Sequence, residues 1–113
     1  MNVSFNGFNE NSVTFEADSN VTVGAPVKMC GNGKVSACAD GEVFCGIATD
    51  VRGDYATVQI AGYVTANYSG SAPTVGYTAI SAGADGAVSA NENGRTYLVT
   101  DVDTTASTVG FML

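Results

Sequence analysis

The sequence predicts an all-β protein: a small barrel or sandwich of short antiparallel strands, built from two similar half-units. Three observations support this prediction. The composition favours strands over helices, since 14 of the 113 residues are glycine, only 13% are charged, and the chain has just two Leu, two Lys and two Arg. Short segments of alternating apolar and polar residues are separated by turn residues. A five-residue motif also occurs twice.

The repeated motif reads GKVSA at residues 33–37 and GAVSA at residues 86–90. A Val-Gly pair precedes each copy, Val23-Gly24 before the first and Val75-Gly76 before the second. Two copies are too few to stack as a solenoid, so we expect both to belong to one compact domain.

The chain length limits the domain organisation. A chain of 113 residues has room for one domain with a modest core. We expect a single β domain over residues 21–113, with half-units at about 21–66 and 74–113, preceded by residues 1–20 as an N-terminal arm or a first strand. The segment 69–75, which contains a proline and small residues, is the expected loop between the half-units.

The expected strands are bounded by turn signals. Asp40-Gly41 and Arg52-Gly53-Asp54 are typical turn sequences, and Ala61-Gly62 is expected to break or bulge one long strand. Helix is expected to be absent or confined to one turn. The expected strands are residues 12–16, 25–30, 34–38, 42–50, 55–66, 77–81, 87–90, 95–102 and 108–113.

The charge makes two classes of partner unfavourable. The net charge is −7, the isoelectric point is near 4.1, and no run of Lys or Arg occurs. Phosphate backbones and anionic lipid would repel such a chain, so we expect neither nucleic acid nor membrane as a partner. The first residues lack the basic and apolar regions of a signal peptide, and no apolar run is long enough to span a bilayer, so we expect synthesis in the cytosol.

The residue types argue against an enzyme. The chain has no His, and Cys30, Cys38 and Cys45 form no Cys-x-x-Cys pair, so we expect reduced thiols, no catalytic residue, no metal site and no cofactor. The acid pairs Asp101/Asp103 and Asp50/Asp54 fall at expected turns, where Asp binds local backbone groups. Residues 52–54 read Arg-Gly-Asp, which we interpret as an ordinary turn with an Arg-Asp charge pair at its rim.

Several motifs in order resemble a known family. Residues 23–27 read VGAPV, residues 44–48 read FCGIA, residues 58–64 read VQIAGYV, and residues 84–88 read ADGAV. This order resembles the small capsid-decoration, or cement, proteins of tailed bacteriophages over residues 21–113. The usual second Gly-Val-Ala step is replaced here by Tyr-Leu-Val, and the first twenty residues match no motif of that family.

The resemblance implies a non-enzymatic virion structural protein without a cofactor. Such a protein is made in the cytoplasm of the bacterial host, binds the outer surface of the assembled shell through the major capsid protein, and is often a homotrimer on the virion surface. A partner that binds only the assembled shell stabilises it by its binding free energy.

Two surfaces are candidates for these contacts. The N-terminal segment is expected to be an arm that orders on the capsid, with Val3, Phe5 and Phe8 as its binding residues; alternatively Val13 and Phe15 only form the first core strand. Self-association is expected to use an apolar strand face. The candidate residues for it are Tyr63, Val64 and Tyr68.

Two other classes of function stay open. One is a carbohydrate-binding module, in which exposed tyrosines form a platform. The other is an adhesin-type β module, which would explain the Arg-Gly-Asp sequence at residues 52–54. The tyrosines available for a platform are Tyr55, Tyr63, Tyr68, Tyr77 and Tyr97.

Overall fold

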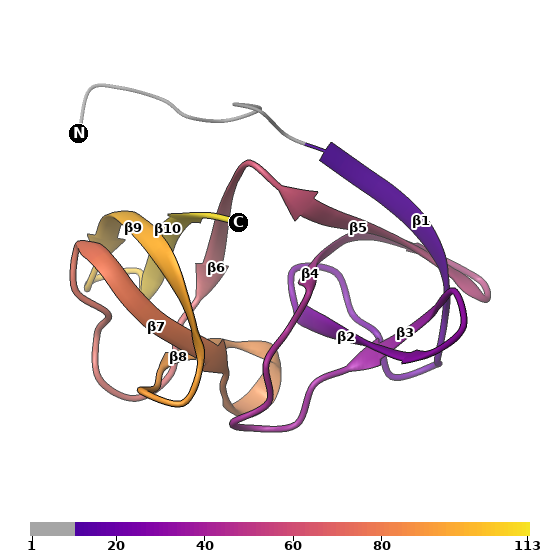
Figure 1. Cartoon of the computed structure of the whole chain (residues 1–113), viewed down its shortest axis with the longest axis horizontal. Helices are drawn as coiled ribbons and strands as arrows, with labels where there is room; N and C mark the ends of the chain where they lie inside the picture. The colour runs from indigo at the N-terminus through magenta and orange to yellow at the C-terminus, as the bar shows by residue number, and fades with distance from the viewer. Residues whose placement is uncertain (1–10) are drawn as a thin grey trace.

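The computed structural model describes residues 11–113 and confirms the all-β prediction. Its strands form two five-stranded units that lie side by side (Figure 1). The first unit is a closed barrel with the strand order β1-β3-β2-β4-β5, and the second is a sheet with the order β6-β10-β9-β7-β8. Within this range there is one 3-10 turn, η1 (Ala84–Gly86), and no helix long and apolar enough to span a bilayer.

The barrel closes because β1 pairs on both of its edges. It runs antiparallel to β5 and, through Glu16 opposite Lys34 and Ala17 opposite Val35, parallel to β3. Closure shortens the unpaired sheet edge that a strand of a second molecule could join. The barrel strands are β1 (Asn11–Ala17), β2 (Pro26–Gly31), β3 (Lys34–Ala37), β4 (Gly46–Arg52) and β5 (Tyr55–Ala61).

The second sheet has the same connectivity as the barrel. β7 pairs with β8 and β9, and β9 with β10, just as β2 pairs with β3 and β4, and β4 with β5. β6 joins β10 as β1 joins β5, and a parallel bridge between Tyr68 and Val88 corresponds to the β1–β3 contact. The two copies of the repeated motif supply β3 and β8. The strands are β6 (Tyr63–Asn67), β7 (Gly76–Ala82), β8 (Val88–Ala90), β9 (Arg95–Asp103) and β10 (Thr108–Met112).

The chain passes from barrel to second sheet at Gly62. The strand expected over residues 55–66 breaks there, since Gly62 has a φ of 87°, a conformation that favours glycine. The side chain of Gln59 stabilises the backbone on both sides of Gly62, because its Nε2 donates hydrogen bonds to the carbonyl oxygens of Ala61 at 3.0 Å and Tyr63 at 2.8 Å. The change of sheet therefore falls at Gly62 rather than in the 69–75 loop, and β6 belongs to the second sheet.

The expected strand over residues 42–50 is too long, because β4 begins only at Gly46. The preceding residues cross to the second sheet: Gly41 N–H donates to Ala82 O, and Ala82 N–H donates to Glu42 O, both at 2.8 Å. Phe44 then packs against the rings of Tyr97 and Phe111, whose centroids lie 5.3 and 6.2 Å from its own. Burial of this ring in the second core outweighs continuation of the strand.

Each unit has its own core. In the barrel, Phe15 on β1 packs against buried Val27, Val35 and Val58, whereas Val13 remains partly exposed. The core of the second sheet accepts Phe44 and Ile47 from the barrel half of the chain. Side chains shared in this way join the two units. The other core residues of the second sheet are Val64, Ala66, Ile80, Val88, Tyr97, Val99, Val109 and Phe111.

Candidate functional site

The residues of the expected capsid-binding arm, Val3, Phe5 and Phe8, lie outside the described residues. The point from which the arm would extend is defined. β1 begins at Asn11, which pairs with Ala61 at the crossover between the two units. An arm formed by the residues before Asn11 would therefore extend from beside the place where barrel and second sheet meet.

The three residues expected to mediate self-association pack mainly within their own chain. Val64 is 5% exposed and lies opposite Phe111 in the second core, and Tyr63, on the other face of β6, is 9% exposed. Tyr68 is half-buried against the same core. These side chains offer little surface to a second copy of the protein.

The tyrosines do not share one face. Tyr97 and Tyr63 are buried, while Tyr77 is 80% and Tyr55 58% exposed. Tyr77 lies on β7 of the second sheet, and Tyr55 begins β5 at the end of the barrel that points away from that sheet (Figure 1). The five tyrosines therefore form no common platform.

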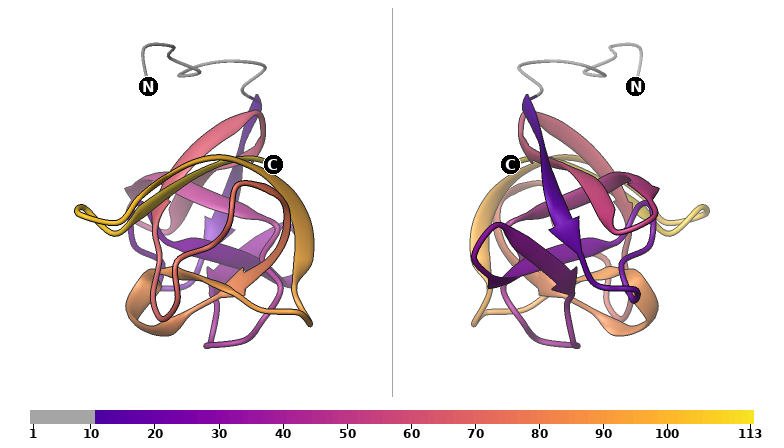
Figure 2. Two further views of the ribbon diagram at one scale, coloured as in Figure 1. Left: turned by 90° about the vertical axis from the view of Figure 1, so that its left-hand side faces the viewer. Right: turned by 90° about the vertical axis from the view of Figure 1, so that its right-hand side faces the viewer.

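Three of the four acids considered for catalysis accept hydrogen bonds from neighbouring residues, and Asp50 and Asp101 lie on strands rather than in the expected turns. Asp103 accepts hydrogen bonds from the backbone N–H groups of Thr105 at 3.0 Å and Ala106 at 3.1 Å, in the β9–β10 turn that projects from the body in Figure 2. Asp101 accepts a hydrogen bond from the Thr100 hydroxyl at 2.7 Å. Among residues 11–113, no group of three or more Cys, Asp or Glu is placed to hold a metal ion, and the three thiols are free.

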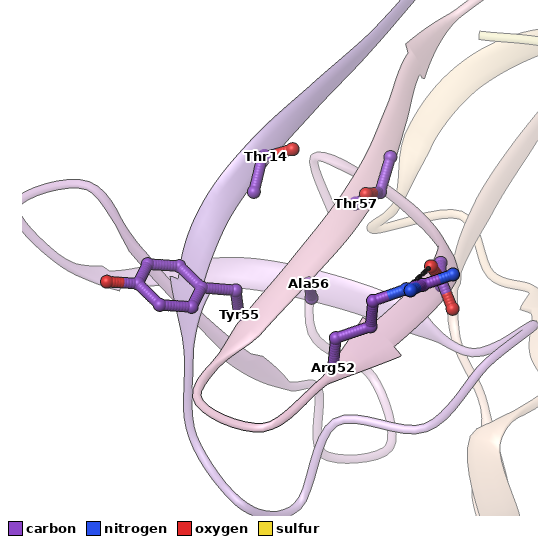
Figure 3. Close-up of a pocket in the computed structure, with 6 residues that line it drawn as sticks. Thr14, Arg52, Tyr55, Ala56 and Thr57 are labelled. Atoms are coloured by element: carbon purple, nitrogen blue, oxygen red, sulfur yellow. Dashed lines mark hydrogen bonds and ion pairs between the residues drawn. The ribbon is translucent and has the colours of Figure 1, made fainter.

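One surface depression, which we call the strand-face pocket, gathers side chains from three neighbouring strands. It measures about 190 Å³ and opens on the outside of the barrel, over β1, β5 and β4. Figure 3 shows the Tyr55 ring and the Arg52 side chain extending in opposite directions, with Thr14 and Thr57 farther along β1 and β5. Its lining residues are Thr14, Asp50, Arg52, Tyr55, Ala56 and Thr57.

A tight turn and the strand register assemble this pocket. Gly53, with a φ of 57°, and Asp54 link β4 to β5, so that Arg52 lies directly opposite Tyr55. Thr57 lies between its two partners, Thr14 on β1 and Asp50 on β4. Apart from the buried Ala56, the lining side chains therefore stand on the outer face of a closed barrel, whose pairing fixes their spacing.

Arg52 forms its ion pair with Asp50 of its own strand rather than, as expected, with Asp54 of the Arg-Gly-Asp turn. Arg52 Nε donates to Asp50 Oδ2 at 2.8 Å, because residues two apart on a strand point to the same face. This hydrogen bond lowers the pKa of the Asp50 carboxyl and raises the pKa of the Arg52 guanidinium, so both groups are charged at neutral pH. The wall they form carries donors and acceptors but no net charge.

Sequence reasoning missed this pocket, although two signals for it were present. Tyr55 and Thr57 alternate on one strand, and a two-residue turn places Arg52 opposite Tyr55. The contribution of Thr14 has no local signal, because it depends on how β1 pairs with β5.

Comparison with solved structures shows that this fold occurs in a phage protein. The chain superimposes with a TM-score of 0.62 on the N base of the head fiber gp8.5 of bacteriophage phi29, over 92% of this chain and 93% of that one, at 18% sequence identity. At that identity the likeness establishes the shared fold. No protein-family model matches the sequence, and no curated protein matches it.

Proposed function

We propose that this protein is a structural component of a tailed bacteriophage virion, attached to the outside of the capsid without enzymatic activity. The observation that carries the proposal is the likeness to a phage head-fiber base, because it spans nearly the whole of both chains. The order of motifs over residues 21–113, which resembles capsid-decoration proteins, is a separate argument in the same direction.

The partner under this proposal is the major capsid protein, and the result of binding is a more stable shell. A protein that binds only the assembled shell stabilises it by mass action. The net charge of −7 opposes binding to packaged or free DNA, which keeps the protein on the shell. A closed barrel also limits edge-to-edge association while copies accumulate in the host cytoplasm.

We further propose that the protein acts as a homotrimer, and that the outer face of the second sheet forms the contact. Tyr77 lies opposite Leu98, and Leu98 lies opposite Met112, so these three side chains form a row across β7, β9 and β10. This apolar row replaces the expected contact residues on β6, whose side chains are largely covered by their own chain.

Co-sedimentation with capsids of the phage that carries the gene tests the function. Capsids stripped of accessory proteins are mixed with the full chain, and the bound fraction and the temperature of capsid disruption are measured. We expect saturable binding and a higher disruption temperature. A full chain that stays in the supernatant at every concentration overturns the proposed function.

The same assay tests the N-terminal arm. Deletion of residues 1–10 leaves β1 intact, because β1 begins at Asn11, so the truncated protein retains its barrel. A full-length variant with Val3, Phe5 and Phe8 replaced by Ser is the matched control for chain length. We expect both proteins to bind capsids at least tenfold more weakly. Unchanged affinity would exclude the arm while leaving capsid attachment in place.

A further inference from the structure

We propose that the strand-face pocket of the barrel binds a neutral saccharide. Its walls combine an exposed aromatic ring with hydroxyl groups and a compensated charge pair, over a floor formed by the strands themselves. This activity is additional to capsid attachment and does not depend on it.

The shape suits one sugar ring on an open surface. The Tyr55 ring forms one side of the pocket and is 58% exposed, so its face is free to pack against the C–H groups of a sugar. Ligand sites generally combine such an apolar surface with a few placed polar groups. A depression of about 190 Å³ that is open to solvent admits one residue of a longer glycan, whose chain continues outside.

The polar groups match the hydroxyls of a sugar. Arg52 uses Nε for the bond to Asp50 Oδ2, so its terminal N–H groups and the remaining lone pairs of the carboxylate lie side by side. Neighbouring sugar hydroxyls both donate and accept, and an adjacent donor and acceptor therefore bind such a pair of hydroxyls. Thr14 on the neighbouring strand β1 and Thr57 on the central strand β5 add hydroxyls of the same dual character.

The charge selects a neutral ligand. The guanidinium of Arg52 is already paired with Asp50, while Glu16 on β1 lies opposite Tyr55 in the strand register and Asp54 immediately precedes Tyr55 in the turn. An anionic sugar or a phosphate would meet these carboxylates without a free cation to compensate them, in a protein of net charge −7. Uronic acids, sialic acids and phosphorylated glycans are therefore excluded.

The pocket is preformed, which lowers the entropic cost of binding. Thr14, Asp50 and Thr57 occupy paired positions in the barrel, above the buried core residues Ala56 and Val58. A site on paired strands loses less freedom on binding than a site on loops. Many copies on one particle, as the proposed function implies, would convert weak single-site binding into firm attachment to a glycan surface.

Binding of neutral oligosaccharides to the purified full-length protein tests the inference. The probes are maltohexaose, cellohexaose, mannohexaose and chitohexaose, with hyaluronan hexasaccharide as the anionic comparison. Binding is followed by two-dimensional NMR of the labelled protein. We expect at least one neutral probe to shift the amide signals of Thr14, Asp50 and Thr57, and hyaluronan to shift none of them. No shift with any neutral probe, or shifts confined to other strands, overturns the inference.

Two variants distinguish saccharide binding in the pocket from non-specific binding to exposed aromatic side chains. Tyr55→Ala removes the aromatic wall, and Tyr77→Ala removes the other highly exposed tyrosine, on the second sheet. Both side chains are largely solvated, so both variants keep their fold, which the NMR spectrum itself verifies. We expect Tyr55→Ala to weaken binding at least tenfold and Tyr77→Ala to leave it unchanged. Equal losses would overturn the inference, and neither result bears on capsid co-sedimentation, which uses no sugar.

Discussion

The hydroxyl of Tyr63 donates a hydrogen bond to Oδ1 of Asp101 at 3.0 Å, across the backbone of Gly110. Three strands meet in this contact, since Tyr63 begins β6, Gly110 lies in β10 and Asp101 belongs to β9. A Cβ atom at Gly110 would collide with the Tyr63 hydroxyl and with the Asp101 carboxylate. Glycine at this position therefore lets the tyrosine lie flat on the sheet and reach the acid.

Replacement of Tyr63 by Phe tests the energetic value of this contact. Asp101 loses one of its donors, and a hydrogen bond to a charged group contributes roughly 1.5–3 kcal/mol. Because the site is at the edge of solvent, we expect a decrease of about 1 kcal/mol in the free energy of unfolding, measured by urea denaturation. Tyr77→Phe is the matched control, and its exposed hydroxyl should contribute almost nothing. Equal stability of the two variants would contradict the prediction.

The local features of the fold could be predicted because their causes are local. Asp54 after Gly53 specifies a tight turn from two adjacent residues, and the break at Gly62 follows from a backbone conformation that favours glycine. The path of residues 42–45 could not be predicted in the same way. Val43, Phe44 and Cys45 alternate as a strand does, and only the rings supplied by the second half of the chain divert Phe44 from that strand.

Replacement of Phe44 by Ala tests whether this ring joins the two units. The side chain is fully buried against Tyr97 and Phe111, and deletion of a buried Phe costs about 3–5 kcal/mol. Val43→Ala is the control, since Val43 is 51% exposed next to it, and a change within about 0.5 kcal/mol is expected there. Urea denaturation followed by circular dichroism measures both. A Phe44→Ala variant as stable as Val43→Ala would mean that the ring contributes no net packing energy.

Alkaline pH should destabilise the protein through its buried acids. Burial raises the pKa of the Cys38 thiol from 9.0 to about 11, and burial also raises the pKa values of Tyr63 and Tyr97 above 10.0. A raised pKa means that the folded state holds the proton more tightly. The stability that Cys38 contributes is complete below pH 9.0 and is lost as the pH rises toward about 11, with the tyrosines adding to the loss above pH 10.0.

The Cys38→Ala variant isolates the contribution of the thiol. Its free energy of unfolding should fall less than that of the original protein between about pH 9 and pH 11. At neutral pH the thiol is protonated in both the folded and unfolded states. The difference in free energy of unfolding between the two proteins at that pH therefore measures only the loss of packing by the Cys38 side chain. Urea denaturation under reducing conditions gives the values. Parallel pH profiles for the two proteins would contradict the assignment to Cys38.

The candidate site was only partly predictable. From the sequence, Arg52 can be identified as a turn residue and Tyr55 as an aromatic side chain. The tight turn between them can also be predicted. Thr14 joins them because β1 pairs with β5 across most of the barrel, which is a long-range register. Burial of Val64 likewise depends on β10, whose Phe111 is paired with it from far along the chain. Contacts of this kind have no signature in a short window of sequence.

The proposed trimer predicts how molecular mass depends on salt and on Tyr77. Each copy carries a net charge of −7, so copies repel one another until salt screens the repulsion. Light scattering at several protein concentrations should therefore show the trimer fraction rising with NaCl. Tyr77→Ala truncates the most exposed side chain of the apolar row and should lower the association constant of the trimer at least tenfold. Tyr55→Ala should leave this association constant unchanged. The two tyrosines thus have opposite assignments, Tyr55 to the saccharide pocket and Tyr77 to the contact between copies. A monomeric mass under all conditions, or the same loss in both variants, would exclude the second sheet as the trimer contact.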